Sequence, residues 1–172
     1  MPSFQSDGVR IAYWDEGEGD PILLIHGFAS NAGTNWVDPG WVRTLVASGC
    51  RVIAFDNRGH GQSEKLYVPE RYGAPTMAED ARALLDHLGI GRADVLGYSM
   101  GGRISAFLVL KHPERVRSVI FAGLGINMVR GMVGTGPLAK ALEAKSIDDV
   151  TNDTARSFTA FAEHTKGDLR AL

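Results

Sequence analysis

Short apolar runs alternate with helical patterns along this chain, and this alternation restricts the possible folds more than any other feature. The runs lack polar–apolar alternation and occupy residues 22–25, 51–55, 94–96 and 118–122. Apolar residues at helical spacing predict helices over 41–47, 76–88 and 100–111. Uninterrupted apolar strands are typical of parallel sheets that helices cover on both faces. The sequence therefore predicts an α/β fold with a doubly wound, mostly parallel sheet.

Two local signals refine the first half of this pattern. Residues 9–14 follow a turn at Asp7-Gly8 and predict an outer strand. Thr76-Met77-Ala78-Glu79 has the spacing of a capping box, in which the hydroxyl and the carboxylate each satisfy a free backbone N–H. We therefore expect the second helix to begin at this box.

The character of the chain changes after Gly123. Glycines interrupt an apolar connector, and two helical segments follow near 137–145 and 147–164, with a start signal for the second at Ser146. We therefore predict the N-terminal part of an α/β core over residues 1–126. Residues 127–172 are then a connector and the beginning of a helical cap.

Composition excludes several classes of partner. The chain has 172 residues, a net charge of −2 and no long run of either sign, so we expect neither nucleic-acid nor membrane binding. The N-terminus lacks the basic and apolar regions of a secretory signal, and no apolar stretch approaches the roughly 20 residues that cross a bilayer. A single cysteine, Cys50, is expected to be a small buried hydrophobe in a reducing compartment. These features predict a soluble cytoplasmic protein.

The motif most informative about chemistry is Gly97-Tyr98-Ser99-Met100-Gly101-Gly102, which joins a predicted strand to a predicted helix. In such a G-x-S-x-G turn the serine is held at a sharp elbow and its hydroxyl faces outward. Gly97 and Gly101 would allow the strand and the helix to approach closely. Ser99 would also lie at a helix N-terminus, where developing negative charge is favoured. Ser99 is therefore the candidate nucleophile, and a plain helix cap is the alternative.

A second motif, His26-Gly27-Phe28, directly follows the apolar run 22–25. Acyl transfer needs two fixed donors for the oxyanion of the tetrahedral intermediate, and backbone N–H groups suit this role. We expect Met100 to supply one N–H and Phe28 the other. His26 is expected to hydrogen-bond the surrounding backbone rather than to accept the proton of Ser99.

A third motif, Asp56-Asn57-Arg58-Gly59-His60-Gly61-Gln62-Ser63, follows the run 51–55. Asp56, Arg58 and His60 could form a charged catalytic cluster. We favour a structural interpretation, in which these side chains hydrogen-bond the loop itself and the neighbouring turns.

These three ordered motifs, with Lys111-His112-Pro113-Glu114-Arg115-Val116 before the last strand, resemble the alpha/beta-hydrolase family. The resemblance is greatest to small esterases and to the cofactor-free haloperoxidase or perhydrolase branch. It covers residues 8–125 closely, and the remainder looks like the start of that family's helical cap. The resemblance implies an acyl-enzyme on Ser99 and no metal or organic cofactor.

The chain departs from the family in its catalytic triad. The family's acid and histidine follow the nucleophile in the chain, on later strands. Here His112, His164 and Asp168 all lie in helical or tail segments, and residues 123–127 contain no carboxylate. The resemblance therefore implies that the last core strands are absent and that a complementary C-terminal segment supplies the acid and the base. We expect the isolated 172-residue chain to be inactive.

Two further expectations concern this missing part. Residues 118–122 would form an edge strand with apolar side chains on both faces, which favours association. Residues 165–168 are polar and would form an exposed tip of the kind that proteases cut. A homo-oligomer is a further possible state.

Three functions compete. The leading one is hydrolysis of a small-molecule carboxylic ester, with Ser99 as nucleophile and the Phe28 and Met100 amides as oxyanion donors. Perhydrolysis would use the same site with peroxide in place of water. A non-catalytic binder of small ligands is the third, because this fold also serves proteins that only bind. Met128, Val129, Met132 and Phe158 are candidates for an apolar pocket in the cap.

Overall fold

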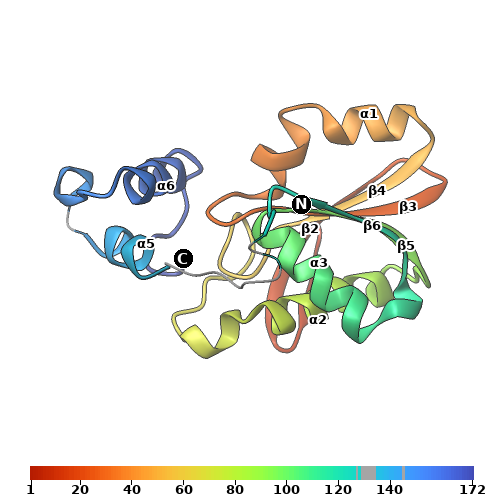
Figure 1. Cartoon of the computed structure of the whole chain (residues 1–172). Helices are drawn as coiled ribbons and strands as arrows, with labels where there is room; N and C mark the ends of the chain where they lie inside the picture. Colours follow the sequence, from red (N-terminus) through yellow and green to blue (C-terminus); the bar gives the residue numbers. More distant parts are fainter. Residues whose placement is uncertain (127, 129–134, 145) are drawn as a thin grey trace.

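In the residues that the computed structural model describes (1–126, 128, 135–144 and 146–172), a six-stranded sheet forms the centre of the molecule (Figure 1). The strands are β1 (Ser3–Ser6), β2 (Val9–Glu16), β3 (Asp20–Ile25), β4 (Cys50–Phe55), β5 (Ala93–Tyr98) and β6 (Val116–Ala122). Their order is β1-β2-β4-β3-β5-β6. The four strands β4, β3, β5 and β6 are parallel, whereas β1 and β2 form an antiparallel edge. The predicted mostly parallel sheet is confirmed.

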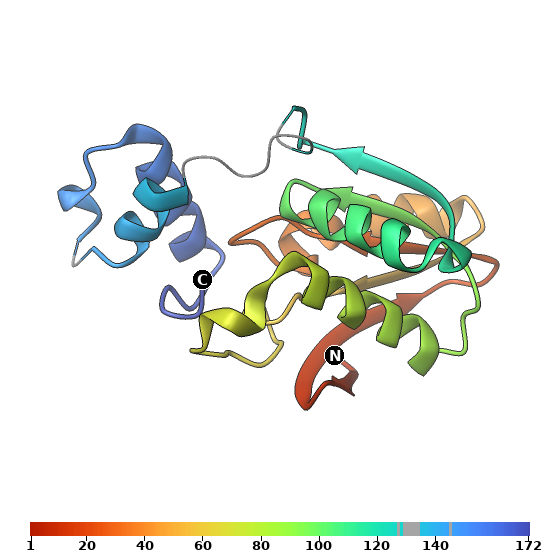
Figure 2. The ribbon, with the colours of Figure 1, turned by 60° about the horizontal axis from the view of Figure 1, so that its bottom comes forward.

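Helices cover both faces of this sheet, with α1 on one face and α2 and α3 on the other (Figures 1 and 2). The longer helices are α1 (Trp41–Ala47), α2 (Ala74–His87), α3 (Met100–Lys111), α5 (Thr135–Leu142) and α6 (Asp153–His164). Short helical turns lie at η1 (Gly33–Val37), η2 (Pro69–Tyr72), η3 (Pro113–Arg115) and η4 (Ile147–Asp149). Among the described residues, no helix is both long enough and apolar enough to cross a bilayer.

The core consists of two apolar layers that the strands share. Leu23 and Ile25 of β3 pack with α2 and α3, whereas Leu24 packs with Val42 of α1. Neighbouring residues of a strand face opposite sides of a sheet, so a run without polar residues fills both layers. This is the physical reason that the uninterrupted apolar runs predict a doubly wound sheet.

The structure corrects three sequence predictions about where elements begin. The strand β1, which was not expected, pairs with β2, so the expected outer strand is second from the edge of the sheet. The helix α2 begins at Ala74, and Gly73 precedes it with no side-chain capping bond, so the predicted capping box at Thr76 is wrong. The Ser146 signal opens only the short turn η4, and the hydroxyl of Ser146 accepts from the Asp148 N–H. The helix α6 begins later, where the side chain of Asn152 accepts from the Ala155 N–H.

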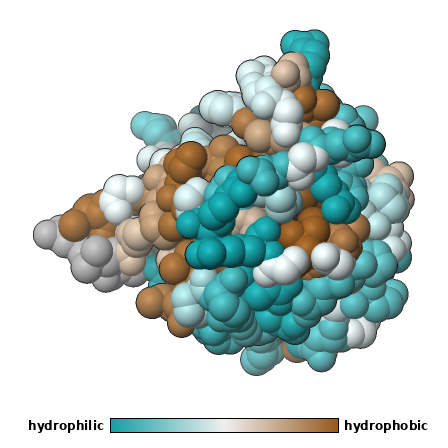
Figure 3. Space-filling view, turned by 90° about the vertical axis from the view of Figure 1, so that its right-hand side faces the viewer, coloured by the Kyte–Doolittle hydropathy of each residue, from teal (hydrophilic) through white to brown (hydrophobic). Residues whose placement is uncertain are grey.

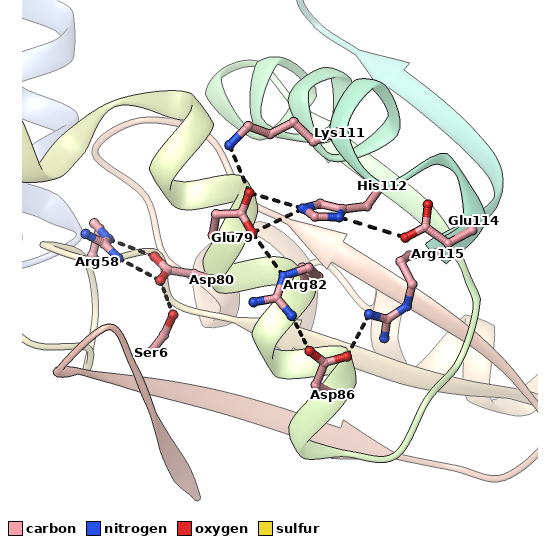
Figure 4. A network of polar contacts seen from close by, with 10 residues as sticks. All are labelled: Ser6, Arg58, Glu79, Asp80, Arg82, Asp86, Lys111, His112, Glu114 and Arg115. Atoms are coloured by element: carbon pink, nitrogen blue, oxygen red, sulfur yellow. Dashed lines mark hydrogen bonds and ion pairs between the residues drawn. The ribbon is translucent and has the colours of Figure 1, made fainter.

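Glu79 has another role than capping (Figure 4). Its carboxylate accepts hydrogen bonds from Lys111 at 2.9 Å and from Arg82 at 2.9 Å, and it lies 3.1 Å from Nε2 of His112. Partial burial acts to raise the pKa of Glu79, but these hydrogen bonds lower it to about 2. The residue therefore links α2 to the end of α3.

Cys50 begins β4, as expected, but it is half-buried rather than buried. It packs beside the apolar layer that contains Val52 and Ala54. The expectation of a buried thiol is therefore wrong, because Cys50 is the first residue of the strand.

The helices α5 and α6 lie together beside one end of the sheet, apart from its two faces (Figures 1 and 2). We call residues 135–144 and 146–172 the cap segment. The connector residues Gly131 and Gly134 and the pocket candidates Val129 and Met132 lie outside the described residues.

The end of the cap segment is not the free tip that the sequence suggested. Thr165 Oγ1 donates to the backbone carbonyl of Ala29 at 2.7 Å, and Asp168 accepts from the Tyr67 hydroxyl at 2.7 Å. Lys166 is exposed, whereas Thr165, Gly167 and Asp168 are half-buried. Hydrogen bonds therefore attach this segment to the core.

The strand β6 forms the other edge of the sheet, and in the described part of the chain no strand pairs with its outer side. Ile120 is 57% exposed and Phe121 is 41% exposed, although these neighbours face opposite sides of the sheet. Figure 3, which views the molecule from the right-hand side of Figure 1, shows patches of apolar surface among the hydrophilic side chains. The expected apolar edge is confirmed.

Candidate active site

Three loops meet at one end of the sheet because they follow the carboxyl ends of neighbouring parallel strands. They begin at His26 after β3, at Asp56 after β4 and at Ser99 after β5. Ligands of open α/β sheets bind at this edge, outside the carboxyl ends of the strands. The fold thus brings the three sequence motifs to a single place.

Ser99 lies in the sharp turn between β5 and α3. Its backbone has φ 52° and ψ −114°, a conformation that residues other than glycine rarely adopt. The Ser99 N–H donates to the carbonyl of Ala122 at 2.7 Å, which holds the turn against the end of β6. The residue is half-buried and lines a cavity. Non-glycine residues in such conformations are concentrated at functional sites, where the surrounding structure maintains the strain.

The glycines around Ser99 allow α3 to approach the sheet at backbone distance. A Cβ atom on Gly97 would lie 2.3 Å from the carbonyl oxygen of Gly101. A Cβ atom on Gly101 would lie 2.0 Å from the carbonyl oxygen of Ile25. Backbone atoms cannot move aside as a flexible side chain can, so neither position admits a larger residue.

His26 holds the loop that follows β3. We call this loop (residues 26–32) the oxyanion loop, after the role expected of the Phe28 amide. The Nδ1–H of His26 donates to the carbonyl of Gly27 at 2.7 Å, and its Nε2 accepts from the Asn57 N–H at 2.9 Å. Complete burial lowers the pKa of His26 to about 4, so its imidazole is neutral at pH 7. Both ring nitrogens are engaged with backbone groups, and neither is free to accept a proton from Ser99.

The expected oxyanion donors are the backbone amides of Met100, which directly follows Ser99, and of Phe28. Met100 is the first residue of α3, and the first N–H groups of a helix have no partner within the helix. Phe28 lines the same cavity as Ser99. The peptide before Phe28 is held through the Gly27 carbonyl, which accepts from His26. The preceding peptide is held through the Gly27 N–H, which donates to Asn35 Oδ1 at 3.2 Å.

The loop after β4 has the structural role expected from its sequence. Asp56 accepts from the Ala32 N–H at 2.8 Å and from the Gln62 N–H at 2.7 Å, and thereby ties this loop to the oxyanion loop. Burial raises the pKa of Asp56, against the effect of these hydrogen bonds. Nδ1–H of His60 donates to the carbonyl of Arg58 at 2.9 Å.

A cavity of about 390 Å³ lies between these loops and α6. Its lining residues are Gly27, Phe28, Ser30, Asn35, Tyr98, Ser99, Thr154, Ser157, Phe158 and Phe161. Cavities of this size accommodate small organic ligands. The Phe28 and Phe158 rings, 6.3 Å apart, join the oxyanion loop to the cap segment on one side of it.

The sequence analysis missed most of these lining residues. Of the two cap candidates that lie in the described residues, Phe158 lines the cavity and Met128 does not. The α6 residues 154, 157, 158 and 161 are spaced so that they share one helix face. That spacing is visible in the sequence, but it does not indicate which surface the face covers. Asn35 has no sequence signal, because the turn η1 that carries it was not predicted.

The described lining of the cavity contains no side chain that could complete a triad with Ser99. Neither a carboxylate nor a histidine lines the cavity within the part of the chain that the structure describes. His112 lies beside Glu79 between α2 and α3, and Asp168 is bonded to Tyr67. Over the same described residues, no three His, Cys, Asp or Glu side chains are placed to hold a metal ion.

The sheet topology, the strained serine turn and the glycines packed against it define an α/β enzyme fold with a candidate nucleophile at the strand ends. Comparison with known families gives the class: the profile of the alpha/beta hydrolase fold matches residues 20–162. The chain belongs to this family.

Relatives within the family have diverse activities. The chain is 37% identical over 116 residues to 2-hydroxymuconate semialdehyde hydrolase of Pseudomonas sp. strain CF600, covering 67% of this chain and 40% of that protein. It is 38% identical over 115 residues to the non-heme chloroperoxidase CPO-A1 of Kitasatospora aureofaciens, covering 66% of this chain and 40% of that protein. A solved structure from work on carboxylesterases of Nitrososphaera gargenis has a TM-score of 0.68 at 26% identity, covering 99% of this chain and 68% of that one.

The chain thus spans about 40% of the length of the curated relatives that it matches. The activities in their names belong to longer polypeptides than this chain.

Proposed function

We propose that this chain contributes the nucleophile and the oxyanion donors of a serine hydrolase that acts on carboxylic esters. One observation carries the proposal: Ser99 adopts a strained backbone at the N-terminus of α3 and lines a cavity of about 390 Å³. An N-cap serine needs no such strain, because caps ordinarily have extended backbone angles. The carboxylesterase likeness supports the same reaction class.

In the proposed mechanism Ser99 Oγ attacks the ester carbonyl while its proton passes to a general base. The carbonyl oxygen becomes an oxyanion, which accepts hydrogen bonds from the Phe28 and Met100 amides. The tetrahedral intermediate then collapses, and the protonated base returns the proton to the departing alcohol. Water attacks the acyl-enzyme in the same manner and releases the acid and free Ser99.

We propose that the base and its carboxylate partner lie on a complementary segment outside these 172 residues. That segment would follow the core (1–126) and the connector with the beginning of the cap (127–172). His26 is unavailable because backbone groups occupy both of its nitrogens. The exposed apolar edge at β6 provides a surface that such a segment would cover. Without it, oxyanion binding alone would leave on the order of a thousandfold acceleration over water.

Perhydrolysis is a second candidate, and the likeness to a chloroperoxidase supports it. The same acyl-enzyme would be attacked by peroxide, giving a peracid instead of an acid. A binder without catalysis is the third. It would use the cavity and leave Ser99 unmodified.

A fluorophosphonate probe tests the proposal, because it reacts with an activated serine. It is applied to the 172-residue chain and to the longer polypeptide, each as wild type, Ser99→Ala and Ser105→Ala. Ser105 is a buried serine of α3 whose hydroxyl donates to the Gly101 carbonyl at 2.8 Å, so it serves as the matched control. We expect rapid labelling of the longer polypeptide that only Ser99→Ala abolishes.

The other outcomes decide between the candidates. Rapid labelling of the 172-residue chain would contradict the external base. No labelling of the longer polypeptide would favour the binder. Product analysis with and without hydrogen peroxide separates hydrolysis from perhydrolysis.

A further inference from the structure

The end of α6 is a rigid structure that fixes Thr165. The Lys166 N–H donates to the Glu163 carbonyl at 2.9 Å, and the Gly167 N–H donates to the Ala162 carbonyl at 2.8 Å. This pair of bonds is the Schellman motif, and Lys166 adopts the left-handed conformation it requires, with φ 56°. Thr165 occupies the C-cap of this motif, so its backbone has little freedom.

From that position the Thr165 side chain reaches the oxyanion loop. Its Oγ1 lies 2.7 Å from the carbonyl oxygen of Ala29 and 3.0 Å from that of Ala162. A hydroxyl has one proton to donate, so the shorter contact, with Ala29, receives the stronger bond. This bond links residues that are 136 positions apart in the sequence.

Within the oxyanion loop, Ala29 is the residue with a left-handed backbone conformation. Its φ is 58°, and this conformation is unfavourable for an alanine. Its side chain is 1% exposed and packs with Leu142 and Ala162 of the cap segment. Ala29 directly follows Phe28, whose amide is a proposed oxyanion donor. The cap segment therefore packs on, and bonds to, the strained part of this loop.

A second contact reinforces the same docking. The Tyr67 hydroxyl donates to Asp168 at 2.7 Å, and the Arg170 guanidinium lies 5.2 Å from the centre of the Tyr67 ring. Tyr67 belongs to the segment between β4 and α2, so the contact joins the cap segment to the core on a different loop. Both contacts are exposed or half-buried, and their loss would not open the sheet core.

We propose that Thr165 is a positioning residue that couples docking of the cap segment to the conformation of the oxyanion loop. The Phe28 amide is then in place for catalysis only while the cap segment is docked. This inference rests on the proposed function for its catalytic consequence, but the coupling itself concerns the loop alone. It can therefore be measured with and without catalysis.

The first experiment measures the coupling through amide hydrogen exchange in the 172-residue chain. Informative amides are those of Gly27, Ser30 and Ala32, which donate to Asn35, to the Gly27 carbonyl and to Asp56. Thr165→Val keeps the shape and removes the hydroxyl, and we expect about tenfold faster exchange at these amides. Thr165→Ser retains the hydroxyl and should exchange as the wild type.

Thr151→Val is the matched control, because Thr151 is exposed elsewhere on the cap segment. Unchanged exchange in Thr165→Val would overturn the coupling. Equal acceleration in Thr151→Val would show that the effect is not specific to this contact, and would overturn it as well. Equally accelerated exchange at the β3 amides would show that Thr165→Val loosens the whole core rather than the loop, and would overturn the coupling too.

The second experiment measures ester turnover in the longer polypeptide. Thr165→Val should lower kcat about tenfold and change KM less than twofold, because the oxyanion forms only in the transition state. Thr165→Ser should restore kcat. A rise in KM alone would overturn the positioning role. Absence of any Ser99-dependent turnover in the wild type would instead contradict the proposed function, and the exchange experiment would still decide the coupling.

Discussion

Ser99 has a backbone conformation that glycine adopts more easily than any other residue. Because strain of this kind costs of order 1–3 kcal/mol, relieving it should raise the free energy of unfolding. We expect Ser99→Gly to be more stable than Ser99→Ala by about 1 kcal/mol, after the greater entropy of unfolded glycine is subtracted. Urea unfolding of the two variants measures this difference. A less stable Ser99→Gly would show that the turn is not strained.

Two buried histidines make stability depend on pH. Burial lowers the pKa of His26 to about 4, and burial together with repulsion from His26 lowers the pKa of His60 to about 3. In the unfolded chain both bind a proton near pH 6.5, so between pH 6.5 and 4 the unfolded state holds more protons. Above pH 6.5 the two histidines therefore do not lower the free energy of unfolding. As the pH drops from 6.5 toward 4, they lower it progressively.

We expect this fall to be on the order of 1 kcal/mol per pH unit for each histidine. His60→Gln should reduce the slope between pH 6 and 5, whereas His164→Gln, which removes an exposed imidazole, serves as control. Urea unfolding at each pH gives the slope. NMR titration of the His26 imidazole near pH 6.5 would contradict the expectation.

At the scale of elements, a buried ion pair joins the loop after β4 to α2 and β1 (Figure 4). Arg58 donates two hydrogen bonds of 2.7 Å to Asp80, and the Ser6 hydroxyl donates to the same carboxylate at 2.5 Å. The side chains of Arg58 and Asp80 are 0% and 1% exposed. Removal of one charge from such a pair leaves the other uncompensated in the core.

Asp80→Asn should therefore lower the free energy of unfolding by about 3–5 kcal/mol. Asp86→Asn in the same helix is the matched control, because the Asp86 side chain is 47% exposed in its ion pairs. This substitution should lower the free energy of unfolding by less than about 1 kcal/mol. The double variant Arg58→Met with Asp80→Leu should recover much of the loss. Equal effects of the two Asn variants, measured by urea unfolding, would contradict this.

At the scale of the whole molecule, the edge strand β6 should determine how the 172-residue chain behaves in solution. Ile120 and Phe121 expose apolar surface on both faces of an unpaired edge, which favours self-association. Phe121→Lys should lower the apparent mass in light scattering at high concentration. Val68→Lys, at an apolar residue 52% exposed away from this edge, should not. A similar decrease in apparent mass with both variants would show that any added positive charge, rather than a change at the β6 edge, reduces self-association.

The sequence by itself determined the type of fold and the positions of its chemical motifs. Apolar runs such as 22–25 and the glycines around Ser99 encode local geometry, and parallel strands then bring their carboxyl ends to one edge. Residues 3–6 were not predicted as a strand, because so short a segment gains its structure from pairing with β2. The start of α6 was also misplaced, because several side chains near it can cap a turn.

Only the tertiary structure decided which distant groups meet. It placed Asn35 beside Gly27, the Thr154–Phe161 face of α6 over Ser99, and the Thr165 hydroxyl on Ala29. Periodicity in a sequence reports which residues share a face of one element. It does not report which other surface that face covers, because such contacts depend on the packing of separate segments, up to 136 residues apart in the sequence.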